Sequence, residues 1–189
     1  MISSKHNLRT ELSGAQAEST NNRMEMTAAI KALEALKKPC IVELYTDGAC
    51  SPNPGVGGWG AVLISSKHNL RTEISGAEVD TTNNRMELTA AIKALEALKK
   101  PCFVELYTDS SYLKNAFEQK WLNNWQNKEW KTKAGKPVAN KDLWLRLLEV
   151  SRNHEVSWHW VKGHSGHPEN VRCDELAVKA RKEWSKSVK

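Results

Sequence analysis

Features that mark membrane and secreted proteins are missing from this sequence of 189 residues. It has no apolar run of about 18 residues, so no transmembrane helix is expected. The first residues, MISSKHNLRTEL, lack the apolar core of a signal peptide. The 4 cysteines form no CxxC pair, which argues against a disulfide framework. We therefore expect a soluble, cytoplasmic protein with reduced thiols and no membrane partner.

The sequence also lacks an excess of acidic residues. Its 28 Lys and Arg residues exceed its 22 Asp and Glu residues, for a net charge of +6. This excess fits a polyanionic partner, although charge alone does not identify one. Hydrophobic residues make up 40% of the chain, which is enough for a packed core. The length suits one domain plus an extension.

An internal repeat is the most conspicuous feature of the chain. Residues 1–47 align with 63–109 at a fixed offset of 62 without gaps, and NNRME, for example, occurs in both copies. Two copies do not make a solenoid, and nothing downstream repeats. We therefore predict that 1–40 is a partial repeat of 63–102 that precedes a complete domain at 41–189.

Three roles are open for residues 1–40. They are a passive extension, a competitor that brings Glu25 where Glu87 should lie, or an element exchanged between two chains. Connectivity favours the second copy, because it leads directly into the strand predicted at 103–109 without displacing other elements. The expected state is a monomer, and a swapped dimer is the alternative that the repeat permits.

Local patterns predict a mixed sheet packed with helices. Strands are expected at 41–47, 59–65, 71–79, 103–109 and 156–162. Helices are expected at 81–101, 110–120, 140–152 and 169–184. Hairpin strands followed by alternating strands and helices indicate an α/β fold.

Two aspartates end the same hexamer, VELYTD, at Asp47 and Asp109. If the two strands are parallel neighbours, about 4.8 Å apart, these carboxylates lie side by side. They would also lie at the carboxyl ends of the strands, where ligands of open α/β sheets gather. Each aspartate taken alone suits an ordinary turn. Together they would repel each other unless a cation lies between them, and Mg²⁺ is the simplest candidate.

Glu87 supports this interpretation. It shares a helix face with Ala91 and Leu95, which must face the sheet, so its carboxylate points toward the strand ends. The alternative is a capping-box glutamate, because Glu87 follows Asn84 by three residues.

The last helix and the loop before it hold further candidates. Asp174 either joins the acidic cluster or is a surface acid favoured by the helix dipole. His164, in the loop VKGHSGHPEN, either moves protons near a metal or is a surface histidine. A zinc site of His164, His167 and Cys173 is a further alternative, but it lacks paired-ligand spacing and a fourth ligand.

Five motifs in order, TDGACSPNPG, TTNNRME, YTDSSY, VKGHSGHPEN and CDELA, span 41–189. Together they resemble bacterial type 1 ribonuclease H, a hydrolase that cuts the RNA strand of RNA–DNA hybrids. The resemblance implies a ribonuclease H-like mixed five-stranded sheet with helices on both faces. It implies two Mg²⁺ ions per site, with Mn²⁺ as an alternative, and the metal-binding catalytic carboxylates Asp47, Glu87, Asp109 and Asp174. By the same resemblance, His164 assists proton transfer or product release.

The resemblance also implies contacts to the hybrid. The positions that match are Cys50, Asn53, Asn83 and Asn84, with Thr82 at a DNA phosphate. Asn side chains and backbone groups suit the detection of a 2′-hydroxyl, which both donates and accepts hydrogen bonds. A phosphodiesterase with two metal ions would fit the four carboxylates.

Residues 110–141 carry 7 Lys against 2 Glu, with three Trp residues interleaved. Lysines neutralise phosphates, and aromatic rings can pack on sugars or bases. The resemblance to ribonuclease H implies that this segment is the basic protrusion that docks the hybrid's DNA strand. The expected contacts are Ser111, Trp121, Trp125 and Lys128, although Trp121 and Trp125 also suit core packing. Against the family pattern that the resemblance implies, the segment reads QNKEW at its centre, which is less basic than in many relatives, and it carries Ser111 where relatives often have Gln.

Two rival functions were weighed on the same residues. A hybrid-binding module with a dead site would be expected to lack at least one carboxylate, and 41–189 has all four. A DNA-directed polynucleotidyl transferase would be expected to lack the Asn-bearing loops and the Trp- and Lys-rich segment.

Overall fold

The chain divides into two units, Met1–Pro39 and Cys40–Lys189. The structure, a computed structural model, describes residues 40–163 and 167–187. The expectations for residues 1–39, which include Glu25, therefore lie outside the described residues and stay predictions. Within the described ranges, no helix has the length and apolar character needed to cross a bilayer.

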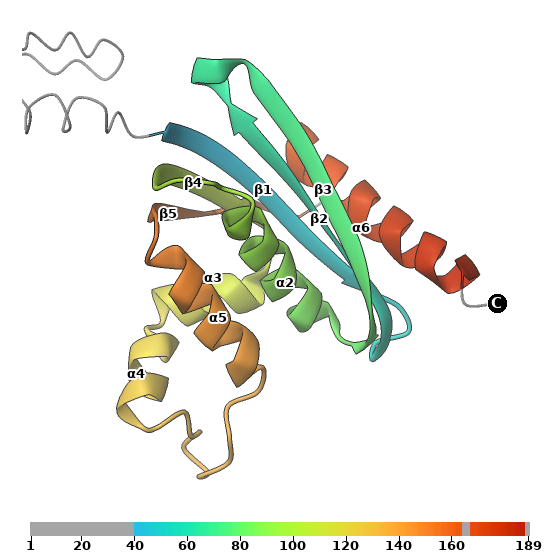
Figure 1. The fold of residues 1–189 in the computed structure, drawn as a ribbon. Helices are drawn as coiled ribbons and strands as arrows, with labels where there is room; N and C mark the ends of the chain where they lie inside the picture. Colours follow the sequence, from blue (N-terminus) through green and yellow to red (C-terminus); the bar gives the residue numbers. More distant parts are fainter. Residues whose placement is uncertain (1–39, 164–166, 188–189) are drawn as a thin grey trace, which may run out of the picture. The chain divides into compact units, whose positions relative to one another are not determined.

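Five strands of the second unit form one mixed sheet (Figure 1). They are β1 (Cys40–Cys50), β2 (Gly55–Ser65), β3 (Leu70–Thr81), β4 (Cys102–Thr108) and β5 (Glu155–Trp160). The spatial order is β3-β2-β1-β4-β5. The first three strands are joined as antiparallel neighbours, whereas β4 and β5 pair in parallel beyond β1. This confirms the predicted mixed five-stranded sheet.

The repeated hexamer forms the centre of the sheet. β1 and β4 are parallel neighbours, and their register runs from Cys40 opposite Cys102 to Thr46 opposite Thr108. Each residue of the first copy therefore lies beside its own counterpart in the second copy. The parallel pairing ends at these threonines, and the aspartates that follow them lie beside each other, while β1 itself continues along β2 to Cys50.

The helices cover both faces of the sheet, as predicted. They are α2 (Asn83–Glu96), α3 (Ser111–Glu118), α4 (Trp121–Asn127), α5 (Lys141–Ser151) and α6 (Pro168–Ser187). α2 packs on β1 and β2 and is in turn covered by α5, while α6 runs across the opposite face over β1, β2 and β3 (Figure 1). The short 3-10 helix η1 (Ser66–His68) connects β2 to β3.

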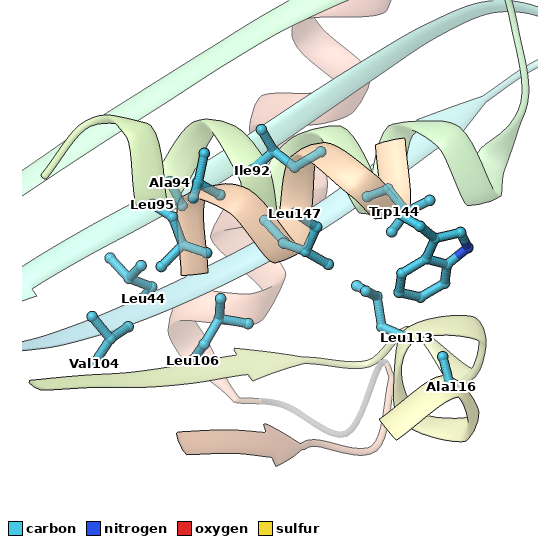
Figure 2. Close-up of a cluster of buried hydrophobic side chains, with 14 of the residues drawn as sticks. Leu44, Ile92, Ala94, Leu95, Val104, Leu106, Leu113, Ala116, Trp144 and Leu147 are labelled. Atoms are coloured by element: carbon cyan, nitrogen blue, oxygen red, sulfur yellow. The ribbon is translucent and has the colours of Figure 1, made fainter. Parts of the chain in front are cut away.

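The larger core lies between the sheet and the helices α2, α3 and α5. Residues on alternate positions of β1 and β4 point into it, among them Leu44, Val104 and Leu106. Figure 2 shows these side chains together with Leu95 of α2 and Trp144 of α5. A fully buried leucine contributes about 1.5–3 kcal/mol relative to an exposed one. These contacts hold β1 and β4 in place, and with them the strand ends that carry the two aspartates.

A smaller apolar cluster lies on the other face, under α6. It joins Tyr45, Val62, Cys173 and Leu176. Tyr45 is stacked on Tyr107 with ring centroids 4.7 Å apart. Because β-strand side chains alternate between faces, Asp47 points to the same face as Tyr45, toward α6.

Candidate active site

Asp47 lies in β1, opposite Gly60 of β2, at the point where the pairing of β1 with β4 stops. Its side chain is partly buried, and one carboxylate oxygen accepts a hydrogen bond of 2.7 Å from the backbone N–H of Gly48. Asp109 follows β4 directly at the same edge of the sheet. The parallel register predicted from the repeated hexamer thus brings these two aspartates together.

Gly48 lets the first turn of α2 approach the end of β1. A Cβ atom at this position would collide with the backbone of Met86 and Glu87. Only glycine permits such a close approach of two backbones. The carboxylate of Glu87 is consequently held beside the strand ends, although it lies in a helix distant in the sequence.

Glu87 is oriented by Ser110 and takes no part in helix capping. The Ser110 hydroxyl donates a short hydrogen bond to the Glu87 carboxylate. The cap of α2 is Thr82, whose side-chain oxygen accepts a hydrogen bond from the backbone N–H of Arg85. The capping-box alternative is therefore wrong: Asn84 lies inside the helix, and Glu87 faces Ser110.

Asp109 has contacts from the end of β5, the loop after it and the first turn of α6. Its Oδ2 accepts a hydrogen bond of 3.1 Å from the side-chain amide of Asn170, and its backbone carbonyl accepts one of 3.2 Å from the Trp160 indole. Gly163 lies so close that a Cβ there would be 2.8 Å from Asp109 Oδ2. Asn170 is buried, and together with Ser110 it is a residue that sequence reasoning did not single out. Asn170 ends the motif VKGHSGHPEN and Ser110 lies in YTDSSY, so their places in these motifs are the signal that could have identified both.

Asp174 reaches the site because α6 packs closely on β2. Cβ atoms at Gly58 and Gly60 would collide with the α6 backbone at Ala177 and Cys173. This contact positions the N-terminal half of α6 so that the charge of Asp174 acts on Asp47. Four separate elements therefore supply the four predicted carboxylates.

Burial and mutual repulsion perturb two of these carboxyl groups. Burial is the main cause that raises the pKa of Asp47 to about 8, and the charge of Asp109 adds to it, with smaller additions from Asp174 and Glu87. Burial raises the pKa of Glu87 to about 7, against the opposing effect of the Ser110 hydrogen bond. Carboxyl groups that repel in this way favour either a bound proton or a cation. Such perturbed groups are typical of functional sites.

The site carries oxygen donors suited to Mg²⁺. Within residues 40–163 and 167–187, however, no three His, Cys, Asp or Glu side chains lie at metal-ligand spacing. The four carboxylates thus interact electrostatically without forming a closed set of ligands. His164 lies outside the described residues. The Cys173 thiol of the zinc alternative is fully buried under α6, and burial raises its pKa, which disfavours a thiolate ligand.

A second group of predicted residues surrounds the loop after β1. The backbone N–H of Cys50 donates a hydrogen bond of 2.6 Å to Asn83 Oδ1, and the backbone N–H of Asn83 donates one of 3.3 Å to Asn53 Oδ1. The Cys50 thiol donates to the carbonyls of Pro52 and Thr81. Asn53, Asn83 and Asn84 are exposed. The sequence-distant loop and the start of α2 therefore form one polar surface next to Glu87.

The predicted Trp- and Lys-rich segment forms α3, α4 and the turns that follow. Trp121 and Trp125 are half-buried against the larger core, with ring centroids 5.7 Å apart, and Trp125 also lies 5.7 Å from Trp144. Core packing, the alternative weighed for these two rings, is what the structure shows. Lys128, at the end of α4, and Ser111, at the start of α3, are exposed.

Comparison with known proteins agrees with this architecture. The profile of the RNase H family matches residues 1–47 and 39–182. The chain belongs to the RNase H family, and the repeat explains why the profile matches twice. This confirms the resemblance to ribonuclease H, and with it the expectation of an enzyme.

Curated relatives and solved structures fall in the same family. The Ribonuclease H of Hydrogenovibrio crunogenus is 60% identical over 142 residues, covering 75% of this chain and 96% of the relative. That of Moorella thermoacetica is 61% identical over 136 residues, covering 72% and 88%. The structure of LC9-RNase H1, a type 1 RNase H with the type 2 active-site motif, superposes with a TM-score of 0.69 at 29% identity, covering 77% of this chain and 74% of that one. LC11-RNase H1, solved in complex with an RNA/DNA hybrid, gives a TM-score of 0.58 at 25% identity, covering 75% and 97%.

Proposed function

We propose that this protein is an endonuclease that hydrolyses the RNA strand of RNA–DNA hybrids by a two-metal-ion mechanism. The observation that carries the proposal is the convergence of Asp47, Glu87, Asp109 and Asp174 at one edge of the sheet. Burial and like charge raise the pKa of Asp47 there, which is expected of a site that accepts cations. The names of the relatives and the hybrid complex of LC11-RNase H1 support the substrate.

The four carboxylates would hold Mg²⁺, with Mn²⁺ as an alternative. The donor set fits a hard cation because it consists of carboxylate oxygens only. When bound, a pair of such ions supplies the charge that activates a water and stabilises the departing oxygen of a phosphodiester. The ionised carboxylates offset this charge, and cation binding would favour their ionised over their protonated forms.

Other residues hold the carboxylates in orientation. Ser110 donates to Glu87, Asn170 donates to Asp109, and the backbone N–H of Gly48 donates to Asp47. Three of the four carboxylates are therefore fixed by hydrogen bonds before substrate arrives. Fixed orientation lowers the cost of assembling the reacting groups. His164 would assist proton transfer or product release, a role that rests on the family resemblance.

The polar surface formed by Cys50, Asn53, Asn83 and Asn84 would contact the hybrid beside the carboxylates. Asn83 uses its side-chain oxygen internally, for the hydrogen bond from the Cys50 N–H. Its side-chain NH₂ group remains as a donor toward a 2′-hydroxyl, which distinguishes RNA from DNA. Thr82 caps α2 at the edge of the same surface and would grip a DNA phosphate.

The segment from α3 to the turns after α4 would bind the DNA strand. Its exposed lysines, including Lys128, would neutralise phosphates. Trp121 and Trp125 would support this surface mainly from the core side, because their rings pack on one another and the ring of Trp125 also packs on Trp144. Monomeric state and cytoplasmic location stay predictions; light scattering of the full chain tests the first.

The test is a cleavage assay with four matched substrates. The full chain is incubated with a hybrid labelled on its RNA strand, a hybrid labelled on its DNA strand, duplex RNA and duplex DNA. We expect Mg²⁺-dependent cutting of the hybrid's RNA strand only, and none in EDTA. Cutting of the DNA strand, or activity that persists in EDTA, would contradict the proposal.

The repeat offers a matched control for the carboxylates. Glu87→Gln should abolish cleavage while hybrid binding persists, because the substitution removes one negative charge and leaves the fold contacts similar in size. Glu25→Gln, the same substitution in the first copy, should leave activity nearly unchanged. The reverse pattern would mean that the first copy supplies the catalytic glutamate.

A further inference from the structure

The two central strands place a pair of cysteines directly beside each other. Cys40 begins β1, Cys102 begins β4, and the two are register partners in parallel strands. Both occur in the sequence KKPC, 62 residues apart, so the internal repeat supplies both thiols. We propose that Cys40 and Cys102 are a reversible oxidation site, at which a disulfide joins β1 to β4.

The backbone geometry suits such a bond. Adjacent strands lie about 4.8 Å apart, and disulfides join residues whose Cα atoms are about 4.4–6.8 Å apart. Both thiols point to the same face of the sheet: Cys40 and Cys102 are buried, at 9% and 5% exposure, whereas their neighbours Ile41 and Phe103 point outward. The Cys102 thiol donates a hydrogen bond of 3.2 Å to the backbone carbonyl of Lys100, just before the same strand. The thiols are therefore adjacent before any reaction.

The other cysteines are placed too far away to compete. Cys50 lies at the opposite end of β1, and Cys173 lies in α6 on the opposite face of the sheet. All four cysteines are unbonded in the structure. Within the chain, Cys40 and Cys102 are thus the one pair of thiols that the fold holds together.

The oxidant is a small-molecule disulfide of the glutathione type. One protein thiolate attacks a sulfur of the small disulfide, forms a mixed disulfide and releases one small thiol. The second protein thiolate then attacks the protein sulfur of the mixed disulfide, closes the Cys40–Cys102 bond and releases the second small thiol. The two protein thiols are oxidised, the small disulfide is reduced to two thiols, and the protons pass to these products.

Reactivity is restrained in the folded protein. Burial, and then the adjacent Cys40 thiol, raise the pKa of Cys102 to about 11. Because the thiolate is the reacting form, exchange should be slow at neutral pH and faster in alkaline solution. Exchange also requires opening at the start of the strands, since neither thiol is exposed.

The expected consequence is a more stable protein. The bond would close a long loop and so lower the conformational entropy of the unfolded chain. The expected result is a rise of ~5–15 °C in Tm. It lies at the end of β1 and β4 opposite to Asp47 and Asp109, so cleavage at temperatures where both forms are folded should be unchanged.

The experiment uses the full chain with glutathione disulfide in alkaline buffer, in two arms: the folded protein, and protein refolded from denaturant so that burial does not limit access. Free thiols are then counted in denaturant, and peptides are mapped without reduction. We expect the 4 thiols to fall to two, a peptide pair joined through Cys40 and Cys102, and a raised Tm that dithiothreitol reverses. Four remaining thiols after refolding with the oxidant would overturn the proposal.

Variants test the pairing. Cys40→Ala and Cys102→Ala should each abolish the joined peptide and the rise in Tm, whereas Cys173→Ala should retain both. A bond that involves Cys50 or Cys173, or one between two chains in the wild type, would overturn the assignment. The wild-type peptide map decides the matter even where a variant folds poorly.

Discussion

Replacing Asp47 by Asn should stabilise the metal-free protein. The carboxylate of Asp47 is buried at the strand end beside Asp109, and its pKa is raised from the ordinary value of 3.8 to about 8. The folded state therefore binds the proton more tightly than the unfolded state does. Asparagine has a similar size and no charge, so it removes the cost of burying the ionised form.

The sign of the pH dependence follows from this pKa. A group whose pKa is raised on folding contributes most stability below its unfolded-state pKa, near 4, and that contribution is lost as the pH rises through about 8. The wild type should thus lose stability across this window in EDTA. Asp47→Asn removes this contribution to the pH dependence, so the gain from the substitution should grow with pH.

The magnitude follows from the same numbers. At about 1.36 kcal/mol per pH unit, the interval from the ordinary pKa of 3.8 to pH 7 gives an upper limit of ~4 kcal/mol. Two effects lower this limit: the repulsion is distributed over neighbouring carboxyl groups, and the asparagine amide must itself be buried. The free energy of unfolding at neutral pH should therefore rise by ~1–4 kcal/mol in Asp47→Asn. Below about pH 4, the difference in the free energy of unfolding between Asp47→Asn and the wild type should vanish.

The assay is urea-induced unfolding in EDTA, for wild type and variant, from acidic to mildly alkaline pH. Asp142→Asn is the matched control. The guanidinium of Arg85 lowers the pKa of Asp142, so removing the Asp142 carboxylate should destabilise the protein. Mg²⁺ should stabilise the wild type more than Asp47→Asn, since a ligand of the folded state shifts unfolding by mass action. A variant no more stable than the wild type at neutral pH, or a gain that does not change with pH, would refute the reasoning.

Further substitutions at four positions separate the positioning of Glu87 from core packing and from surface charge. Gly48→Ala should displace α2 and move Glu87 from the site, lowering kcat at least ~10-fold with ~1–3 kcal/mol of destabilisation; full activity would contradict the backbone collision. Ser110→Ala should raise the Mg²⁺ concentration needed for half-maximal cleavage, because Glu87 loses its hydrogen bond. Ser110→Thr keeps a hydroxyl and should bring this Mg²⁺ concentration part of the way back to the wild-type value. An unchanged Mg²⁺ titration in Ser110→Ala would exclude this positioning role. Trp125→Ala should lower the free energy of unfolding in urea by ~3–5 kcal/mol, because its ring packs against the core. Lys128→Ala should leave this free energy unchanged and reduce the salt dependence of hybrid binding by about one phosphate contact. A stable Trp125→Ala or a destabilised Lys128→Ala would contradict the packing.

Local sequence patterns predicted much of the fold. The VELYTD hexamers lie in β1 and β4, and the helix predicted over 81–101 forms as α2, Asn83–Glu96. Alternation and helical spacing predict these elements because they report which positions are buried. The order of five motifs pointed to the ribonuclease H family, and the family comparisons confirm it. The identity of the two hexamers even suggested the parallel pairing that sets Asp47 beside Asp109.

The remaining features depend on contacts between distant segments. Ser110 as the partner of Glu87, and the close approach of α2 to β1 at Gly48, follow from how helix and sheet pack. The sequence allowed Trp125 either to contact nucleic acid or to pack in the core. Only its neighbours in the folded protein, Trp121 and Trp144, show that it packs against the core.

The sequence by itself therefore determined the elements, the family and the acidic residues at the strand ends. Each of these leaves a local pattern of spacing, alternation or motif order. The tertiary structure alone decided which side chains are buried next to one another. These neighbours set the raised pKa of Asp47, the hydrogen bond from Ser110 to Glu87 and the position of Cys40 beside Cys102. The physical reason is that burial and electrostatic repulsion depend on distances in space, which a one-dimensional pattern does not specify.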